Sequence, residues 1–319
     1  MIWTPLNSAI ESNSSFLLSS HQSLDGDCVG SQLAFLWYLK SRGKKAVCCC
    51  ADPLPQKFAF LKDSEFITQN KPQETFDVLV ILDCSNIQRL GWDVREAGAK
   101  TIINIDHHRD NTNFGDLNFV DPKAAAVGEV IFSFFKECKI EIPPHVAESL
   151  YTAVMTDTGG FRFSNTSSRV LSVCAELADM GVNCADTYEK VYSSHSREGL
   201  ALQSRIWSTL SFHLNGKICS MDMPMSVLDE VGAKYSDSEG MADNTVTAAG
   251  VEVGVMTKHT PEETHFSLRS KGNIDVGKLA KTISGGGGHS CAAGCTIKQP
   301  YREAMEYMLS ILEKELTNL

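Results

Sequence analysis

This sequence of 319 residues lacks long apolar runs, cysteines spaced as a CxxC pair or a disulfide framework, and an excess of positive charge. Even the apolar run Val78 to Leu82 is far too short to span a bilayer. The first residues, Met1 to Pro5, lack the basic stretch and apolar stretch of a secretory signal. We therefore expect a cytoplasmic protein that does not interact with a membrane.

The cysteines show no disulfide framework and no pair with the spacing of a metal or redox motif. There are eleven, and Cys48, Cys49 and Cys50 are adjacent in a predicted strand. Side chains of neighbouring strand residues point to opposite faces, so such a run cannot form a framework of disulfides. Reduced thiols in a cytoplasm are the expected state.

The formal net charge is −10, although 21% of the residues are charged and 43% are hydrophobic. This balance is ordinary for a globular protein with real cores. It argues against a protein that coats long nucleic acid, because such binding requires many phosphates to be neutralised. A small phosphate-bearing substrate, held by a few cations and metal ions, remains compatible with it.

Short strands alternate with helices from the N-terminus to about residue 185. Phe76 to Asp83 and Thr101 to Asp106 are nearly continuous apolar runs, typical of parallel strands buried on both faces. Cys28 to Ser41 has helical periodicity. The pattern predicts an α/β fold with a mostly parallel sheet flanked by helices. The length favours two domains, which we place at 1–185 and 206–319, with a helical connector over 186–205.

The second domain is predicted to be a smaller α/β unit. The pair Asn215-Gly216 is a hairpin signal between short strands. Further strands are expected at Val251 to Thr257 and His265 to Arg269, with helices near Val276 to Thr282 and Tyr301 to Leu316.

One imidazole and two carboxylates, from His21, Asp25 and Asp27, lie within seven residues where a short strand gives way to a helix. Carboxylates so close together repel each other unless a cation lies between them. Oxygen and imidazole ligands suit Mn²⁺, Mg²⁺ or Zn²⁺, and the lack of a cysteine ligand argues against a structural zinc site. Taken alone, the cluster is better explained as a helix cap.

Three more clusters follow predicted strands or helices. Asp83 ends one strand, Asp106-His107-His108 ends the next, and Asp157 lies where a helix breaks at a glycine pair. Ligand sites in parallel sheets lie at the carboxyl ends of the strands, so all four clusters can converge on one edge. Each alone is better explained as a turn or cap, but together they offer too many ligands for one ion. Two ions would activate a water molecule and clamp a phosphoryl group, which predicts phosphate ester or anhydride hydrolysis. Asp106 is expected to orient the adjacent imidazole.

The second domain contains a glycine run, Gly285 to Gly288, before His289. Glycines permit a close approach of the backbone and suit a phosphate cradle, although such a run is usually only a flexible loop. Arg269, followed by Ser270, supplies a cation that could share the phosphate, or it is an exposed charge at the end of a strand.

Together these residues resemble the DHH phosphoesterase superfamily. Its four motifs are matched by His21-x-x-x-Asp25-x-Asp27, Asp83, Asp106-His107-His108 and Asp157-x-Gly159. The associated DHHA1 domain is matched by Arg269-Ser270 and Gly286-Gly287-Gly288-His289-x-x-Ala292-Ala293-Gly294. The match spans nearly the whole chain in the right order. In chain length and in its compact C-terminal domain, the sequence looks most like members of the NrnA-like branch. Those proteins cleave short oligoribonucleotides and 3′-phosphoadenosine-5′-phosphate (pAp).

The resemblance implies a site in a cleft between two domains. One manganese ion would be held by His21, Asp25 and Asp83, and a second by Asp27, Asp83, His107 and Asp157, with Asp83 as the bridge. His108 would contact the scissile phosphate. The substrate would be a short oligonucleotide such as pGpG or pApA, or pAp, gripped by Arg269, Ser270, Gly286, Gly287, Gly288 and His289. Mn²⁺ is the expected metal, with Mg²⁺ as the alternative.

Two departures from the family pattern leave fine substrate preference open. Leu24 replaces a common proline, and Ala126-Val127 replaces a Ser-Thr pair. A manganese-dependent inorganic pyrophosphatase shares the first-domain motifs, but Arg269-Ser270 and the Gly-Gly-Gly-His element disfavour it. A RecJ-like exonuclease would be expected to have more chain and a more basic groove. A nucleotide-binding sensor without turnover is disfavoured by the intact ligand set. The sequence does not decide between a monomer and a homodimer.

Overall fold

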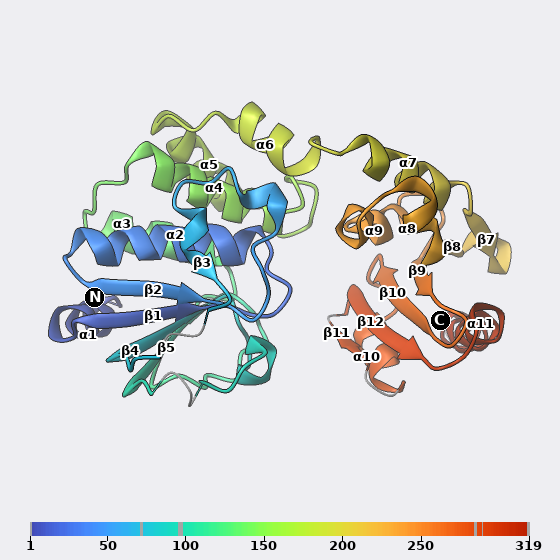
Figure 1. Ribbon diagram of the computed structural model, residues 1–319, viewed down its shortest axis with the longest axis horizontal. Coiled ribbons are helices and arrows are strands. Elements are labelled where there is room, and N and C mark those ends of the chain that lie inside the picture. Colours follow the sequence, from blue (N-terminus) through green and yellow to red (C-terminus); the bar gives the residue numbers. More distant parts are fainter. Residues whose placement is uncertain (1, 71–72, 95–97, 284–285, 289, 318–319) are drawn as a thin grey trace. The chain divides into compact units, whose positions relative to one another are not determined.

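The computed structural model describes residues 2–70, 73–94, 98–283, 286–288 and 290–317. The chain divides into two compact units, Met1–Ser194 and His195–Leu319, each of which is described by itself below (Figure 1). The predicted α/β fold is confirmed: a parallel sheet flanked by helices is followed by a smaller unit with its own sheet. Among the described residues, no helix has both the length and the apolar character to cross a membrane.

The described part of the first unit contains a six-stranded parallel sheet in the order β3-β2-β1-β4-β5-β6. Its central strands are short and almost wholly apolar, and β4 is buried at every position, because both faces of the sheet are covered. The strands are β1 (Ser15–Ser19), β2 (Lys45–Cys49), β3 (Ile67–Thr68), β4 (Val78–Leu82), β5 (Thr101–Asp106) and β6 (Leu117–Val120).

Helices cover one face of this sheet and enclose the main core. Figure 1 shows α2 running alongside β1 and β2, and α3 packs against α2. A smaller apolar cluster on the other face includes Leu17, Leu79 and Ile81, and it is closed by residues around Leu90 in the short 3₁₀ helix η3 (Ile87–Leu90). The helices are α1 (Thr4–Ser12), α2 (Gly26–Ser41), α3 (Val127–Glu137), α4 (Pro144–Asp157), α5 (Ser168–Asp179) and α6 (Cys184–Tyr192).

The second unit is built on a mixed sheet in the order β11-β12-β10-β9-β8-β7. The β8–β9 pair is parallel and the other pairs are antiparallel. The strands are β7 (Ser211–His213), β8 (Ile218–Pro224), β9 (Val253–His259), β10 (Thr264–Ser270), β11 (Gly287–Gly288) and β12 (Ala292–Ile297).

Helices cover both faces of the second sheet. One core contains residues of α10 (Val276–Lys281) and α11 (Tyr301–Thr317). The other core contains residues of α7 (Arg197–Trp207), α8 (Ser226–Val231) and α9 (Met241–Asn244). The Asn215-Gly216 signal does lie between antiparallel strands, and both residues have the positive φ values, 54° and 84°, that such a tight connection needs.

The structure adds elements that the sequence pattern did not reveal. Helix α1, strand β6 and the short edge strand β3 were not predicted, and β12 occupies the end of what was interpreted as a glycine loop. The predicted connector, residues 186–205, covers parts of α6 and α7, and the boundary between the two units falls inside it.

Candidate metal centre

The predicted ligands of the first unit gather at the carboxyl edge of its parallel sheet. His21 follows β1, Asp83 follows β4 directly, and Asp106 is the last residue of β5. In-register parallel pairing, such as Leu18 beside Val80, brings these strand ends side by side. The helices add the remaining carboxylates, because Asp25 and Asp27 begin α2 and Asp157 ends α4.

His21, Asp25 and Asp83 form a first group. The Nε2 atom of His21 lies 3.6 Å from Asp25 Oδ2 and 3.5 Å from Asp83 Oδ2. Asp25 is the N-cap of α2, and its Oδ1 accepts the N–H of Cys28 at 2.9 Å, which leaves Oδ2 facing the imidazole. Nδ1 of His21 faces the carbonyl oxygen of Gln22 at 2.5 Å. That contact fixes the ring so that Nε2 points into the group.

His107, Asp27 and Asp157 form a second group, which Asp83 contacts through His107. Nε2 of His107 lies 3.5 Å from Asp83 Oδ1, 3.6 Å from Asp157 Oδ2 and 3.9 Å from Asp27 Oδ2. Its Nδ1 faces the carbonyl oxygen of Ala124 at 3.3 Å. The side chains of these two groups therefore lie close enough together to hold cations.

Asp83 connects the two groups through its separate oxygens. Oδ2 faces His21 and Oδ1 faces His107. The residue is 2% exposed, and Oδ1 has no hydrogen-bond partner among the described residues. The nearest groups to Oδ1 are the imidazoles of His107 and His108, at 3.5 and 3.6 Å, and a buried carboxylate charge needs such cationic partners or a metal ion. Asp83 also has a φ of +55°, an uncommon backbone conformation that aspartate tolerates better than most residues.

Asp27 is fixed in place by backbone groups from a distant helix. Its oxygens accept the N–H groups of Val127 at 2.6 Å and Gly128 at 2.9 Å, and the hydroxyl of Ser31 at 2.8 Å. These N–H groups begin α3, whose N-cap, Ala126, has no side-chain oxygen to accept them. Asp27 therefore caps α3 from about a hundred residues away. The Ala126-Val127 pair, which departs from the Ser-Thr pair of the family pattern, has no side-chain hydroxyls here and places only backbone donors beside this predicted ligand.

The close approach of α2 to α4 depends on Gly26. A Cβ at this position would lie 2.3 Å from Oγ1 of Thr156. Only glycine permits this contact, which brings the start of α2, with Asp25 and Asp27, beside the end of α4, where Asp157 lies. The other departure, Leu24, is buried in the main core and contributes packing.

His108 and Asp106 form a pair that adjoins Asp83, because Nδ1 of His108 lies 3.6 Å from Asp83 Oδ1. Nδ1 of His108 lies 2.8 Å from Asp106 Oδ1, while the other oxygen of Asp106 accepts from Asn111 at 2.5 Å. Asp106 therefore orients the imidazole of His108, and not that of the adjacent His107 as expected from the sequence. The Nε2 atom of His108 lies 3.5 Å from the Arg89 guanidinium.

The carboxylates and imidazoles perturb one another strongly. Burial alone would lower the pKa of both histidines, but Asp25 and Asp83 raise the pKa of His21 to about 10. Asp83, with Asp27 and Asp157, likewise raises that of His107 to about 11. Burial and the Asp83 charge raise the pKa of Asp27 to about 7. In the metal-free chain, protons on the histidines take the place that cations would hold.

The predicted substrate-binding residues of the second unit gather at one end of its sheet. Arg269 pairs with Ala292 across β10 and β12, and Gly288 pairs with Ala293 from the other side of β12. A Cβ on Gly286 would lie 2.0 Å from the carbonyl oxygen of Ala280. Ser270 follows Arg269 and its hydroxyl accepts the N–H of Gly272 at 3.0 Å. Gly287 lies in β11 with Gly288, and His289 lies outside the described residues.

Four residues at or near these sites were not found from the sequence. Cys28 and Arg89 lie within contact distance of predicted site residues, and Glu129 supports the segment that holds Asp27. In the second unit, Asp243 Oδ1 lies 2.6 Å from Nε of Arg269. For Cys28 and Arg89 the only signal in the sequence was closeness to a predicted ligand: Cys28 follows the first motif directly, and Arg89 lies six residues after Asp83.

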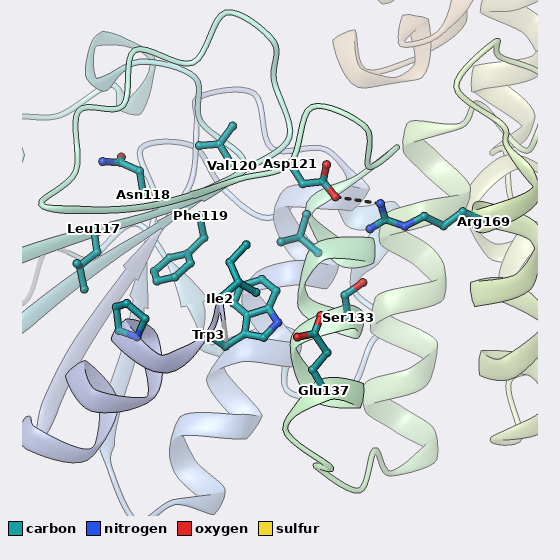
Figure 2. A pocket seen from close by; sticks show the side chains of 12 residues that line it. Ile2, Trp3, Leu117, Asn118, Phe119, Val120, Asp121, Ser133, Glu137 and Arg169 are labelled. Atoms are coloured by element: carbon teal, nitrogen blue, oxygen red, sulfur yellow. Dashed lines mark hydrogen bonds and ion pairs between the residues drawn. The ribbon is translucent and has the colours of Figure 1, made fainter.

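A pocket of about 700 Å³ lies elsewhere in the first unit, between α1, β6 and α3 (Figure 2). Its floor is apolar and includes Trp3 and Phe119, and at its edge Arg169 pairs with Asp121 at 3.0 Å. Of the predicted site residues that the structure describes, none lines it. The chemistry of the ligand clusters, not pocket size, therefore marks the candidate site.

Comparison with known families agrees with this organisation. Residues 15–154 match the DHH family, N-terminal domain, and residues 220–318 match the DHHA1 domain. The chain belongs to the DHH/DHHA1 phosphoesterase family. It is accordingly a hydrolase of phosphate esters that depends on divalent metal ions.

Individual relatives are similar over nearly their full length. The "Bifunctional oligoribonuclease and PAP phosphatase NrnA" of Thermus thermophilus is 32% identical, with 94% of this chain and 90% of the relative covered. The protein of the same name from Bacillus subtilis is 26% identical, with 92% and 93% covered. An exopolyphosphatase-related protein from Bacteroides fragilis has a similar crystal structure, with a TM-score of 0.91, 25% identity, and 98% and 96% of the two chains covered.

Proposed function

We propose that this chain is a two-metal phosphohydrolase that cleaves short oligoribonucleotides, such as pGpG and pApA, to mononucleotides and also converts pAp to AMP. One observation carries the proposal: each oxygen of the buried Asp83 carboxylate faces a different ligand group. A shared carboxylate between two groups is the arrangement that a two-metal phosphohydrolase requires. The names of the two NrnA relatives supply the substrate class.

The donor set fits divalent metal ions. His21, Asp25 and Asp83 would hold one ion, and Asp27, Asp83, His107 and Asp157 the other. Imidazole and carboxylate donors suit Mn²⁺, which we propose as the metal, with Mg²⁺ as the alternative. When bound, the two ions would polarise the phosphoryl group and lower the pKa of an attacking water. Support comes from Asp83 Oδ1, which is buried and makes no directed hydrogen bond, and from the raised pKa values of both histidines.

The residues beside the ligand groups would handle the substrate. Asp106 accepts the Nδ1 proton of His108, so Nε2 is the atom left to contact the scissile phosphate or to give a proton to the leaving oxygen. Arg89, 3.5 Å from that Nε2, supplies a cation on the same side.

We further propose that Arg269, Ser270 and the backbone of Gly286, Gly287, Gly288 and His289 bind a phosphate of the substrate. Glycines allow the backbone to approach an anion closely, and Arg269 supplies a cation at that end of the second sheet. The N–H of Gly286 already donates to the carbonyl oxygen of Ile283 at 2.9 Å, so a phosphate would have to compete for it. Its guanidinium is paired with Asp243, so a substrate phosphate would compete with this carboxylate or share the cation with it.

The first test is a hydrolysis panel with Mn²⁺ present, in which pGpG, pApA, pAp, a long RNA, inorganic pyrophosphate and inorganic polyphosphate are compared at equal concentration. We expect rapid cleavage of the dinucleotides and pAp, with the long RNA spared. Cleavage of pyrophosphate or polyphosphate alone would assign the chain to a different activity. Nucleotide binding without any hydrolysis would support a sensor.

A further inference from the structure

Cys28 lies inside the first ligand group, although no cysteine was expected there. It is on the first turn of α2, fully buried, and its Sγ lies 3.3 Å from Oδ2 of Asp83. One ligand atom from each of His21, Asp25, Cys28 and Asp83 lies within 4.8 Å of all the others. The thiol therefore belongs to a cluster of four donors and is not an isolated cysteine.

The spacing of these donors suits a tetrahedral ion. The separations that involve His21 Nε2 are 3.6 Å to Asp25 and 3.5 Å to Asp83, and Cys28 Sγ is 3.3 Å from Asp83. A tetrahedron with metal–nitrogen and metal–oxygen bonds of about 2.1 Å and a metal–sulfur bond of about 2.3 Å has edges of roughly 3.3 to 3.7 Å. Three of the six separations in this group thus already match those of a four-coordinate site, and the other three lie within 4.8 Å.

The two metal positions differ in softness. In the described residues, the group around His107, Asp27 and Asp157 offers only nitrogen and oxygen atoms. The group around His21 adds a sulfur. Oxygen and imidazole donors suit Mn²⁺ and Mg²⁺, whereas a thiolate favours thiophilic ions such as Zn²⁺ and Cd²⁺.

We propose that Cys28 is a fourth ligand of the first metal position and gives that position selectivity for thiophilic divalent cations over Mn²⁺ and Mg²⁺. The inference rests on the metal site of the proposed function and extends it. On binding, the S–H bond breaks, a sulfur–metal bond forms and the proton passes to water, with no change in oxidation state. Because four protein ligands close a tetrahedral site, Zn²⁺ held in this way would compete with Mn²⁺ and lower turnover.

The test is a titration of the purified full-length protein with Co²⁺, followed by its thiolate-to-metal charge-transfer absorbance. Cys28→Ala is compared with Cys50→Ala, a matched control whose buried thiol contacts Gln32 and belongs to none of the ligand groups. We expect the control to keep the band at the first metal equivalent and Cys28→Ala to lose it. If Cys28→Ala folds poorly, Cys28→Ser replaces it with a close isostere.

A competition experiment gives a second measurement. Cd²⁺ displaces bound Mn²⁺, whose release is followed by electron paramagnetic resonance. In Cys28→Ala, Cd²⁺ affinity should fall about 10-fold or more, in the range typical for lost metal-site interactions, while Mn²⁺ affinity stays near that of the control.

The possible failures are distinguishable. Equal bands and equal Cd²⁺-to-Mn²⁺ affinity ratios in both variants would overturn the role of Cys28 and leave the proposed hydrolase intact, with the thiol only donating to Asp83. A wild-type protein that binds neither Co²⁺ nor Mn²⁺ would overturn the metal site itself, and with it both proposals.

Discussion

The candidate sites of the two units are built in opposite ways. In the first unit the central carboxylates are buried and rigidly held: Asp27 is fully buried, and backbone N–H groups and a hydroxyl occupy its oxygens. Asp25 and Asp157, at the rim of this site, keep 48% and 29% of their side chains exposed. In the second unit the candidate residues lie at a sheet end. Arg269 keeps 28% of its side chain exposed and pairs with an exposed carboxylate, and the neighbouring positions are glycines.

This difference suggests a division of labour. Chemistry on a phosphate needs ligands fixed to within a fraction of an ångström, which buried and hydrogen-bonded side chains provide. Recognition of a short, variable substrate tolerates a partly exposed cation and a flexible backbone. Changes in the first unit should therefore act on turnover and metal content, and changes in the second unit should act on KM.

The largest effect is expected from Asp83→Asn. Asparagine tolerates the positive φ of this position, but it removes the charge that both ligand groups share. We expect turnover to fall on the order of 10⁴-fold or more and bound Mn²⁺ to drop below two ions per chain, measured by steady-state kinetics and elemental analysis. Near-normal activity would rule out the bridging assignment.

His108→Ala should separate chemistry from metal binding within the first unit. Loss of a positioned acid–base group typically costs 10²- to 10⁴-fold in rate, so we expect kcat to fall by about that much while metal content stays unchanged. His107→Ala is the contrasting variant, because its imidazole faces three carboxylates, and it should lose metal. Equal metal loss in both variants would show that His108 is itself a ligand.

The pH dependence of metal binding follows from the raised pKa values. The pKa of His21 is about 10 and that of His107 about 11, so both carry a proton at neutral pH and must release it to bind a metal. Affinity should therefore rise with pH throughout the range below these values. Each ion displaces one histidine proton, so the affinity for each ion rises about 10-fold per pH unit and the overall constant for binding both ions rises about 100-fold.

Calorimetry of Mn²⁺ binding at two pH values near neutrality, in buffers with different ionisation enthalpies, measures both the affinity and the protons released. The pKa of Asp27 is about 7. Its charged carboxylate is the form that binds a metal, so its ionisation also makes metal affinity rise with pH. Affinity that does not change with pH would show that these histidines release no proton on metal binding and would contradict their raised pKa values or their role as ligands.

Arg269→Ala tests the second unit. We expect KM for a dinucleotide to rise about 10-fold, the size of one lost charge-assisted contact, with little change for a small chromogenic phosphodiester. Asp243→Ala removes the partner of Arg269 but leaves the cation. If Arg269 only stabilises the fold through this pair, both variants will behave alike; if it binds substrate, only Arg269→Ala raises KM.

The fold and the position of the first cluster could be predicted because they depend on local patterns. An apolar run such as Val78 to Leu82 predicts a buried parallel strand, and the residue that follows it must lie at the carboxyl edge of the sheet. Asp83 and Asp106 could be placed in this way without any tertiary information.

The remaining features depend on contacts between distant parts of the chain. Asp27 caps α3, and Asp243 pairs with Arg269 from 26 residues away. Whether the Cys28 thiol points into the cluster is decided by how α2 packs on the sheet, which no local pattern encodes. For the same reason, strand β12 was hidden in a glycine-rich segment whose pairing with β10 is a tertiary contact.

The most indirect effect is expected at Glu129, which acts on the cluster through the backbone. Its Oε2 accepts the N–H of Ala125 at 2.7 Å, and Oε1 lies 2.5 Å from Nε of Arg169 in an ion pair that is not a directed hydrogen bond. Ala125 is two residues before Val127, whose N–H holds Asp27. Glu129 therefore fixes the segment from Ala125 to Val127, whose backbone N–H groups donate to the predicted ligand Asp27.

Glu129→Gln keeps the size of the side chain but places an uncharged amide beside Arg169. We expect Mn²⁺ affinity to fall by about 10-fold, at the low end for residues that support metal ligands, with KM for dinucleotides unchanged once metal is saturating. Asp121→Asn is the matched control, because it removes the exposed partner of Arg169 and leaves Glu129 intact. If that variant weakens metal binding equally, the effect comes from Arg169 and α5, and Glu129 has no specific role in holding the segment that caps Asp27.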